Sequence, residues 1–93
     1  MKVYQIDYDL RNRRDYQSLY DRIQSYLMWC RPMESTWVIA TDSNAAEVRD
    51  YLIGALDRDD GILVTRLEGE AAWCNVAPDA SEYLKNLLER QAA

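Results

Sequence analysis

The chain has 93 residues, enough for one domain and too few for two. Its apolar fraction of 48% suffices for a compact core, and its net charge of −5 argues against indiscriminate nucleic-acid binding, which needs many basic contacts to phosphates. Histidine is absent, which excludes Ser-His-Asp and Cys-His catalytic systems and histidine-based zinc sites.

The first predicted element is a strand over residues 3–9. Its aromatic and aliphatic residues share one face, which consists of Tyr4, Ile6 and Tyr8. The other face is mixed and consists of Val3, Gln5, Asp7 and Asp9. Alternation with a period of two is typical of a strand with one buried face.

A basic loop and a helix are predicted next. Arg11, Arg13 and Arg14 lie in the loop and Arg22 follows them, either as a phosphate-binding patch or as a solvated loop and helix face. Asp15 can cap the first turn of the helix. An apolar stripe with helical spacing follows, made of Tyr16, Leu19, Tyr20, Ile23 and Leu27. Pro32 predicts that the helix ends at residues 31–32, because proline lacks an amide donor.

The middle of the chain predicts a strand and a second helix. Residues 35–41 are extended by composition, and residues 33–35 form a possible short strand joined to them. Asn44 and Glu47 resemble a capping box at the start of the helix. Its apolar stripe consists of Val48, Tyr51, Leu52, Ala55 and Leu56. Gly54 costs about 1 kcal/mol against Ala in a helix, which indicates close packing there.

The last third predicts a turn, a strand and a final helix. Residues 58–61 form the turn, residues 62–67 the strand, and residues 71–74 either a short strand or irregular structure. Pro78 and Asp79 open the helix, where Asp79 and Glu82 repeat the capping pattern. Its apolar face consists of Tyr83, Leu84, Leu87 and Leu88.

This order predicts an α+β fold, a ferredoxin-like βαββαβ sandwich with an additional C-terminal helix, in a single domain over residues 1–93. Its first two helices would cover one face of the sheet. The other face, with Val3, Gln5 and Asp7, would be open and would form the interface of a homodimer.

The two cysteines, Cys30 and Cys74, each follow a tryptophan and form no CxxC pair. We interpret both as reduced thiols packed as small apolar residues, with a disulfide between them as the alternative. The start of the chain is not typical of a signal peptide, and no apolar run reaches the ~20 residues that span a bilayer. A cytoplasmic location without membrane contact is therefore expected.

Three segments resemble a known family. Residues 7–10 (Asp-Tyr-Asp-Leu), 34–37 (Glu-Ser-Thr-Trp) and 69–73 (Gly-Glu-Ala-Ala-Trp) are similar to the SinR-like small proteins of the CRISPR-associated protein two superfamily. This superfamily also includes the VapD and GhoS ribonucleases. The resemblance covers nearly the whole chain and implies a ferredoxin-like homodimer. It also implies that an Asp at the end of the first strand binds magnesium beside its symmetry mate, and Asp9 matches that position. The chain departs from the family pattern in its acidic charge and in its final helix, which stands where members commonly place a last strand.

These observations define the candidate site. Asp9 is the candidate catalytic residue and metal ligand for Mg²⁺ or Mn²⁺, and Asp7 is a possible second ligand. The alternatives are that Asp9 caps loop amides and that Asp7 is a hydrogen-bonded acid at the dimer seam. Arg11, Arg13 and Arg14 are the candidate nucleic-acid-binding residues.

Other side chains have two interpretations each. Tyr8, Trp37 and Trp73 either stack on bases or pack in the core and interfaces. Glu68 and Glu70 either face solvent or pair with the loop arginines.

The first functional hypothesis is a metal-dependent endoribonuclease or related nuclease that works as a homodimer on RNA or DNA. The second is a non-catalytic dimeric module with a degenerate nuclease site, which binds a protein partner. A small-ligand regulatory domain is a third class, common for this fold, although no motif points to it.

Overall fold

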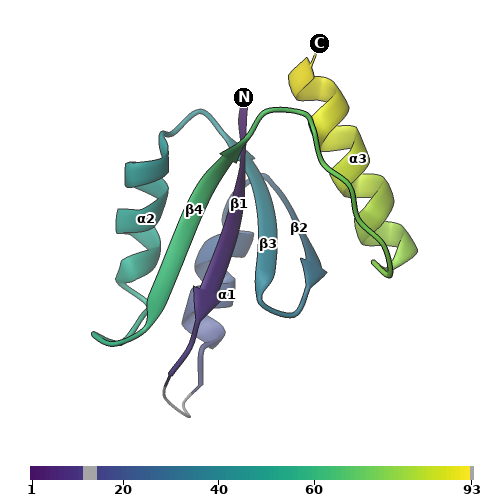
Figure 1. Cartoon of the computed structure of the whole chain (residues 1–93). Coiled ribbons are helices and arrows are strands. Elements are labelled where there is room, and N and C mark those ends of the chain that lie inside the picture. The colour runs from purple at the N-terminus through teal and green to yellow at the C-terminus, as the bar shows by residue number, and fades with distance from the viewer. Residues whose placement is uncertain (12–14, 93) are drawn as a thin grey trace.

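The chain folds into a small α+β structure around one antiparallel sheet (Figure 1). The computed structural model describes residues 1–11 and 15–92, with side chains up to residue 90. These residues form four strands and three helices: β1 (Lys2–Asp9), α1 (Gln17–Gln24), β2 (Met28–Met33), β3 (Thr36–Thr41), α2 (Ala45–Ile53), β4 (Gly61–Leu67) and α3 (Pro78–Ala92). The strand order is β2-β3-β1-β4, which is compatible with the predicted ferredoxin-like class.

Strand β1 lies inside the sheet and sets the position of its two acidic residues. It pairs antiparallel with β3 on one side and with β4 on the other. Asp7 lies opposite Thr36 of β3 and Leu63 of β4, and Asp9 lies opposite Gly61. The pairing with β3 ends at Asp7, so Asp9 has a paired neighbour on the β4 side only.

Helices α1 and α2 cover one face of the sheet. Their buried side chains join those of β1 and β3 in one core, which consists of Tyr4, Ile6, Tyr16, Leu19, Ile23, Trp37, Ile39, Val48, Leu52 and Ala55. Burial of a large aliphatic side chain contributes about 1.5–3 kcal/mol, so this core holds both helices against the sheet. The predicted apolar face of β1 is confirmed.

Helix α2 begins at the predicted capping box. The amide of Glu47 donates to Asn44 Oδ1 (2.9 Å), and the amide of Asn44 donates to Glu47 Oε1 (3.0 Å). Each bond satisfies an amide that has no partner inside the helix.

The predicted close packing at Gly54 is also confirmed, just after the last residue of α2. The Arg22 guanidinium of α1 lies where a Cβ on Gly54 would stand. Arg22 donates to the Tyr51 carbonyl oxygen, and its Cζ lies 5.4 Å from the centroid of the Tyr51 ring. Arg22 therefore joins α1 to α2 and is not part of the basic loop.

Helix α3 covers part of the other face, which corrects the expectation that this face is open. Val3 is only 2% exposed because it packs in a second core with residues of β2, β3 and α3. This core consists of Val3, Cys30, Val38, Ala40, Leu84, Leu87 and Leu88. Figure 1 shows α3 beside β2, at the end of the sheet away from β4. The chain itself therefore occupies the position that the prediction assigned to a partner at Val3.

The predicted end of the first helix is wrong. Helix α1 ends at Gln24, where the Ser25 hydroxyl donates to the Arg22 carbonyl oxygen (2.6 Å), and Leu27 is 85% exposed. Pro32 lies instead in the edge strand β2, whose register shifts between Cys30 and Met33. An edge strand with such an irregularity tolerates proline because no ladder bond requires its amide. The carboxylate of Asp15 accepts the amide of Gln17, the first residue of α1 (2.8 Å), but the N-cap position itself is occupied by Tyr16, which makes no side-chain cap bond.

The final helix begins at Pro78, as predicted, but Asp79 does not cap it. Asp79 lies within the first turn, and the amide of Ser81 donates to the carbonyl oxygen of Ala77 (2.9 Å). The apolar face is confirmed for Leu84, Leu87 and Leu88, whereas Tyr83 is 38% exposed. Residues 71–74 form no strand.

Both cysteines are free thiols. Cys30 is buried, and burial raises the pKa of its thiol to about 11. Cys74 is exposed, so the predicted packing holds for Cys30 and is wrong for Cys74. In the described part of the chain, no helix combines the length and the apolar character needed to cross a bilayer.

Candidate functional site at the end of strand β1

The candidate acids Asp7 and Asp9 lie on the face of β1 that α3 covers only in part. Alternation along β1 places them on the same face as Val3 and Gln5. Val3 lies under α3, whereas Gln5 and Asp7 are half-buried and Asp9 is exposed. Exposure therefore increases along this face from Val3 to Asp9.

Asp7 is engaged by its neighbours in the sheet. The Thr36 hydroxyl donates to Asp7 Oδ1 (2.6 Å), and the Gln5 side-chain amide donates to Asp7 Oδ2 (2.9 Å). Both carboxylate oxygens thus have a donor within the chain. This geometry matches the alternative of a hydrogen-bonded acid, and a metal at Asp7 would have to compete with two hydrogen bonds.

Asp9 forms an exposed ion pair with Arg11. Arg11 Nε lies 3.3 Å from Asp9 Oδ2, with the two side chains 56% and 74% exposed. Exposed ion pairs of this kind contribute about 0–1 kcal/mol, so the pair is easily opened. The alternative prediction was that Asp9 caps amides of the loop. Among the described residues, no loop amide donates to the carboxylate of Asp9.

Arg11 is held in place by the turn before β4. Its Nη1 donates to the Asp59 carbonyl oxygen (2.7 Å), and its amide donates to Asp60 Oδ1 (2.9 Å). Gly61 leaves room for this arrangement, since an added Cβ would lie 3.3 Å from Arg11 Nη2 and 3.7 Å from Asp9 Cβ. The start of the basic loop is therefore fixed against β4.

Asp60 is a residue of this region that the sequence did not reveal. It accepts the amide of Arg11, the hydroxyl of Tyr16 (3.0 Å to each oxygen) and the amide of Asp57 (2.8 Å). The composition of residues 58–61 correctly predicted a turn. It did not predict that Asp60 contacts Arg11, which lies 49 positions earlier in the chain. Asp60 joins both ends of the basic loop to the turn.

The other proposed phosphate-binding residues cannot be placed in this site. Arg13 and Arg14 lie outside the described residues. Among the described residues, neither Glu68 nor Glu70 pairs with Arg11, whose acidic side-chain partner is Asp9.

The candidate stacking residues belong mainly to the core. Trp37 is 1% exposed, and its indole donates to the Tyr8 hydroxyl (3.0 Å), which donates to the carbonyl oxygen of Glu34 (3.2 Å). Burial is the main cause that raises the pKa of Tyr8. Trp73 is 37% exposed, and its indole donates to the Ser81 hydroxyl of α3 (2.8 Å). The packing interpretation thus accounts for Trp37 and Tyr8.

An aromatic cluster surrounds Trp37. Its ring centroid lies 5.9 Å from that of Tyr20 and 5.6 Å from that of Trp29. The guanidinium carbon of Arg31 lies 4.8 Å from the Tyr20 centroid and 5.0 Å from the Trp37 centroid. Arg31 also donates from Nε and Nη2 to the Glu34 carbonyl oxygen (3.0 and 2.6 Å), which fixes it over the rings.

The described residues contain no cluster of three or more Cys, Asp or Glu side chains able to hold a metal ion. The acids do border a shallow hollow of ≈ 310 Å³, which is lined by Asp7, Tyr8, Asp9, Gly61, Ile62 and Leu63. One chain therefore supplies one exposed carboxylate at this hollow, and a complete metal site needs ligands from elsewhere.

Comparison with known proteins adds no family to this picture. No protein-family model and no solved structure matches the chain.

Proposed function

We propose that this chain is a cytoplasmic, ferredoxin-like domain of the CRISPR-associated protein two superfamily, and that it works as a homodimeric, metal-dependent nuclease. The observation that carries the proposal is the position of Asp9. It is an exposed carboxylate at the end of an inner strand, next to the start of a basic loop. The element order and the strand order β2-β3-β1-β4 support the fold assignment.

The strip of this sheet face that α3 leaves uncovered, which includes Asp7, Asp9 and Leu63, supports a dimer. Leu63 lies opposite Asp7 and is 61% exposed, although it is a large apolar residue in a sheet. A second copy packed on this strip would bury Leu63 and bring its own Asp9 towards the first. The partner copy thus contributes a ligand that one chain lacks.

Asp9 fits the ligand preference of the proposed metal. Mg²⁺ and Mn²⁺ prefer oxygen ligands, and Mg²⁺ keeps several waters, so two carboxylates can hold it. When bound, the metal would orient a phosphodiester and activate a water molecule. Ligand oxygens lie ~2.0–2.1 Å from Mg²⁺, so the two Asp9 carboxylates must approach within about 4 Å in the dimer.

Arg11 has a defined role in this proposal. In the free chain its guanidinium neutralises Asp9. When a metal ion neutralises the Asp9 carboxylate instead, the Arg11 guanidinium is free to bind a phosphate oxygen, for which its planar donors are suited. Asp60 holds the Arg11 backbone during this exchange.

The test is cleavage of RNA and of single-stranded DNA with Mg²⁺ or Mn²⁺. Asp9→Asn should abolish cleavage, because the amide is a poor metal ligand. Asp50→Asn is the matched control, since Asp50 also forms an exposed ion pair, with Arg49 at 2.9 Å. Cleavage that survives Asp9→Asn comes from a contaminant and contradicts the proposal.

The dimer is tested separately by sedimentation equilibrium. Leu63→Asp should weaken self-association, whereas Leu27→Asp should not, because Leu27 is 85% exposed and lies outside the strip. A wild-type chain that stays monomeric across the concentration range contradicts the shared metal site.

A second candidate is a non-catalytic dimeric module that binds a protein partner. The observation in its favour is that both acids are engaged within the chain: Asp7 by Thr36 and Gln5, and Asp9 by Arg11. This candidate predicts a dimer without metal-dependent cleavage. A pull-down that recovers a partner from wild type but not from Leu63→Asp would support it.

A further inference from the structure

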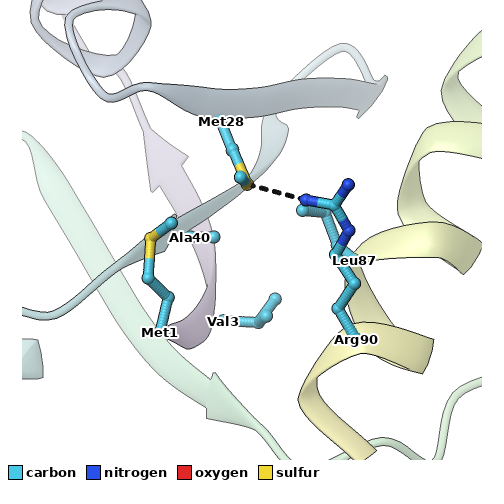
Figure 2. Close-up of a pocket in the computed structure, with 6 residues that line it drawn as sticks. All are labelled: Met1, Val3, Met28, Ala40, Leu87 and Arg90. Atoms are coloured by element: carbon cyan, nitrogen blue, oxygen red, sulfur yellow. Dashed lines mark hydrogen bonds between the residues drawn. The ribbon is translucent and has the colours of Figure 1, made fainter. Parts of the chain in front are cut away.

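A small pocket lies at the opposite end of β1 from Asp9, between the sheet and α3. It has a volume of ≈ 140 Å³ and is lined by Met1, Val3, Met28, Ala40, Leu87 and Arg90 (Figure 2). Figure 2 shows Arg90 reaching from α3 towards Met28 of β2, with Val3, Ala40 and Leu87 around the same space. None of these residues takes part in the site at Asp9.

The base of the pocket is apolar and fixed. Val3, Ala40 and Leu87 are 2%, 5% and 4% exposed, and all three belong to the core under α3. Met1 and Met28 complete the apolar lining. Methionine side chains are unbranched and adapt to ligands of different shape.

Arg90 brings a cation to this apolar space. Its Nη1 lies 3.8 Å from the Met28 sulfur, which is a weak acceptor. No carboxylate among the described residues pairs with Arg90, and the charge of its guanidinium is not neutralised there. The pocket thus combines an apolar base with an unpaired cation at its edge.

A second hollow of ≈ 290 Å³ adjoins the pocket, with which it shares Met28, Leu87 and Arg90. It extends along α3 to Tyr83 and Asn86. Tyr83 and Asn86 add a hydroxyl and an amide donor on the Arg90 side of the pocket. All these donors suit an anion.

We propose that this pocket binds a small aliphatic carboxylate. The hydrocarbon chain lies against Val3, Ala40 and Leu87, and the carboxylate meets the Arg90 guanidinium, with Tyr83 and Asn86 as further donors. This binding site is independent of the function proposed for Asp9.

The volume sets the length of the ligand. A dry cavity of ~150 Å³ in another protein holds benzene, so ≈ 140 Å³ accommodates a chain of about six carbons. Each methylene that enters the pocket should raise affinity about fourfold, which corresponds to its transfer free energy. Affinity should therefore rise from butanoate to hexanoate and level off by octanoate.

The experiment is a titration of the full chain with butanoate, hexanoate and octanoate, followed by methyl resonances in NMR. The methyl signals of Val3, Ala40 and Leu87 should shift with saturation and with the predicted length dependence. Hexanol and hexylammonium are the controls for charge. Unshifted methyl signals, or equal binding of hexanol or hexylammonium and hexanoate, would overturn the proposal.

Three variants test the contacts. Arg90→Gln should weaken hexanoate binding at least about threefold, because it removes the ion pair. Lys85→Gln is the matched control, since Lys85 is an exposed cation of α3 that does not line the pocket. If Arg90→Gln and Lys85→Gln weaken hexanoate binding equally, only the net charge of the protein matters, and the role assigned to Arg90 is overturned. Ala40→Val should fill part of the pocket, so the ligand length at which affinity stops rising should be shorter than in the wild type. If this variant does not fold, the series of ligand lengths on the wild type still tests the proposal.

Discussion

Replacement of Asp60 by alanine is the sharpest test of how the basic loop is held. Its carboxylate accepts, from the described residues, the amide of Arg11, the hydroxyl of Tyr16 and the amide of Asp57. Tyr16 is 6% exposed, so its hydroxyl cannot freely recover a water partner. The bond to Asp57 is also partly buried.

The expected loss follows from the two partly buried bonds. A hydrogen bond contributes about 0.5–1.5 kcal/mol net, and more when the acceptor is charged, so Asp60→Ala should cost about 2–3 kcal/mol. A domain of this size has a total stability of roughly 5–14 kcal/mol. The midpoint of thermal unfolding should fall by about 10–20 °C, because ~1 kcal/mol shifts a domain of this size by about 4–8 °C.

The assay is urea unfolding followed by circular dichroism. Asp42→Ala is the charge-matched control, since the side chain of Asp42 is 90% exposed, and it should change stability by less than about 0.5 kcal/mol. Tyr16→Phe in both backgrounds isolates one bond, with an expected coupling of about 1 kcal/mol. A loss for Asp60→Ala no larger than that of Asp42→Ala would refute the anchoring role.

Three other predictions concern the core and the helix ends. Asn44→Ala removes the capping box of α2 and should lower the free energy of unfolding by about 1 kcal/mol in urea titrations. Gly54→Ala should leave the stability of the wild type nearly unchanged, because the gain from replacing glycine is offset by the displacement of Arg22. In an Arg22→Ala background the same change should stabilise the protein by about 0.5–1 kcal/mol. Equal effects in both backgrounds would contradict this. Burial raises the pKa of Cys30 from 9.0 to about 11, so the unfolded chain loses the thiol proton first as pH rises. The stability difference between wild type and Cys30→Ala should therefore be constant below pH 9 and decline through pH 11.

Local patterns in the sequence predicted most elements correctly. Alternation in residues 3–9, the Asn44 capping signal and the apolar stripe of α3 are all short-range features, and each depends on neighbours within one strand or one helical turn. The first helix was predicted too long because Leu27 continues a helical spacing that the chain abandons after Gln24. The spacing of apolar residues does not show at which residue the helical backbone hydrogen bonds end.

Long-range placement could not be predicted in the same way. An amphipathic helix must cover something, but its stripe does not say which surface, so the docking of α3 over Val3 was missed. The bonds of Asp60 to Arg11 and of Thr36 to Asp7 join residues 49 and 29 positions apart. Such contacts depend on strand register, which the sequence did not specify. Asp9 itself was located correctly at the end of β1, while its pairing with Arg11 emerged only from the structure.

The distribution of tryptophans has a practical consequence for spectroscopy. Trp37 and Trp29 belong to one aromatic cluster on the sheet, whereas Trp73 is tied to α3 through Ser81. Fluorescence of the cluster should report global melting, and that of Trp73 should report detachment of α3. A Trp73→Tyr variant keeps only the fluorescence of the cluster, so the difference between wild type and variant separates detachment of α3 from loss of the whole fold.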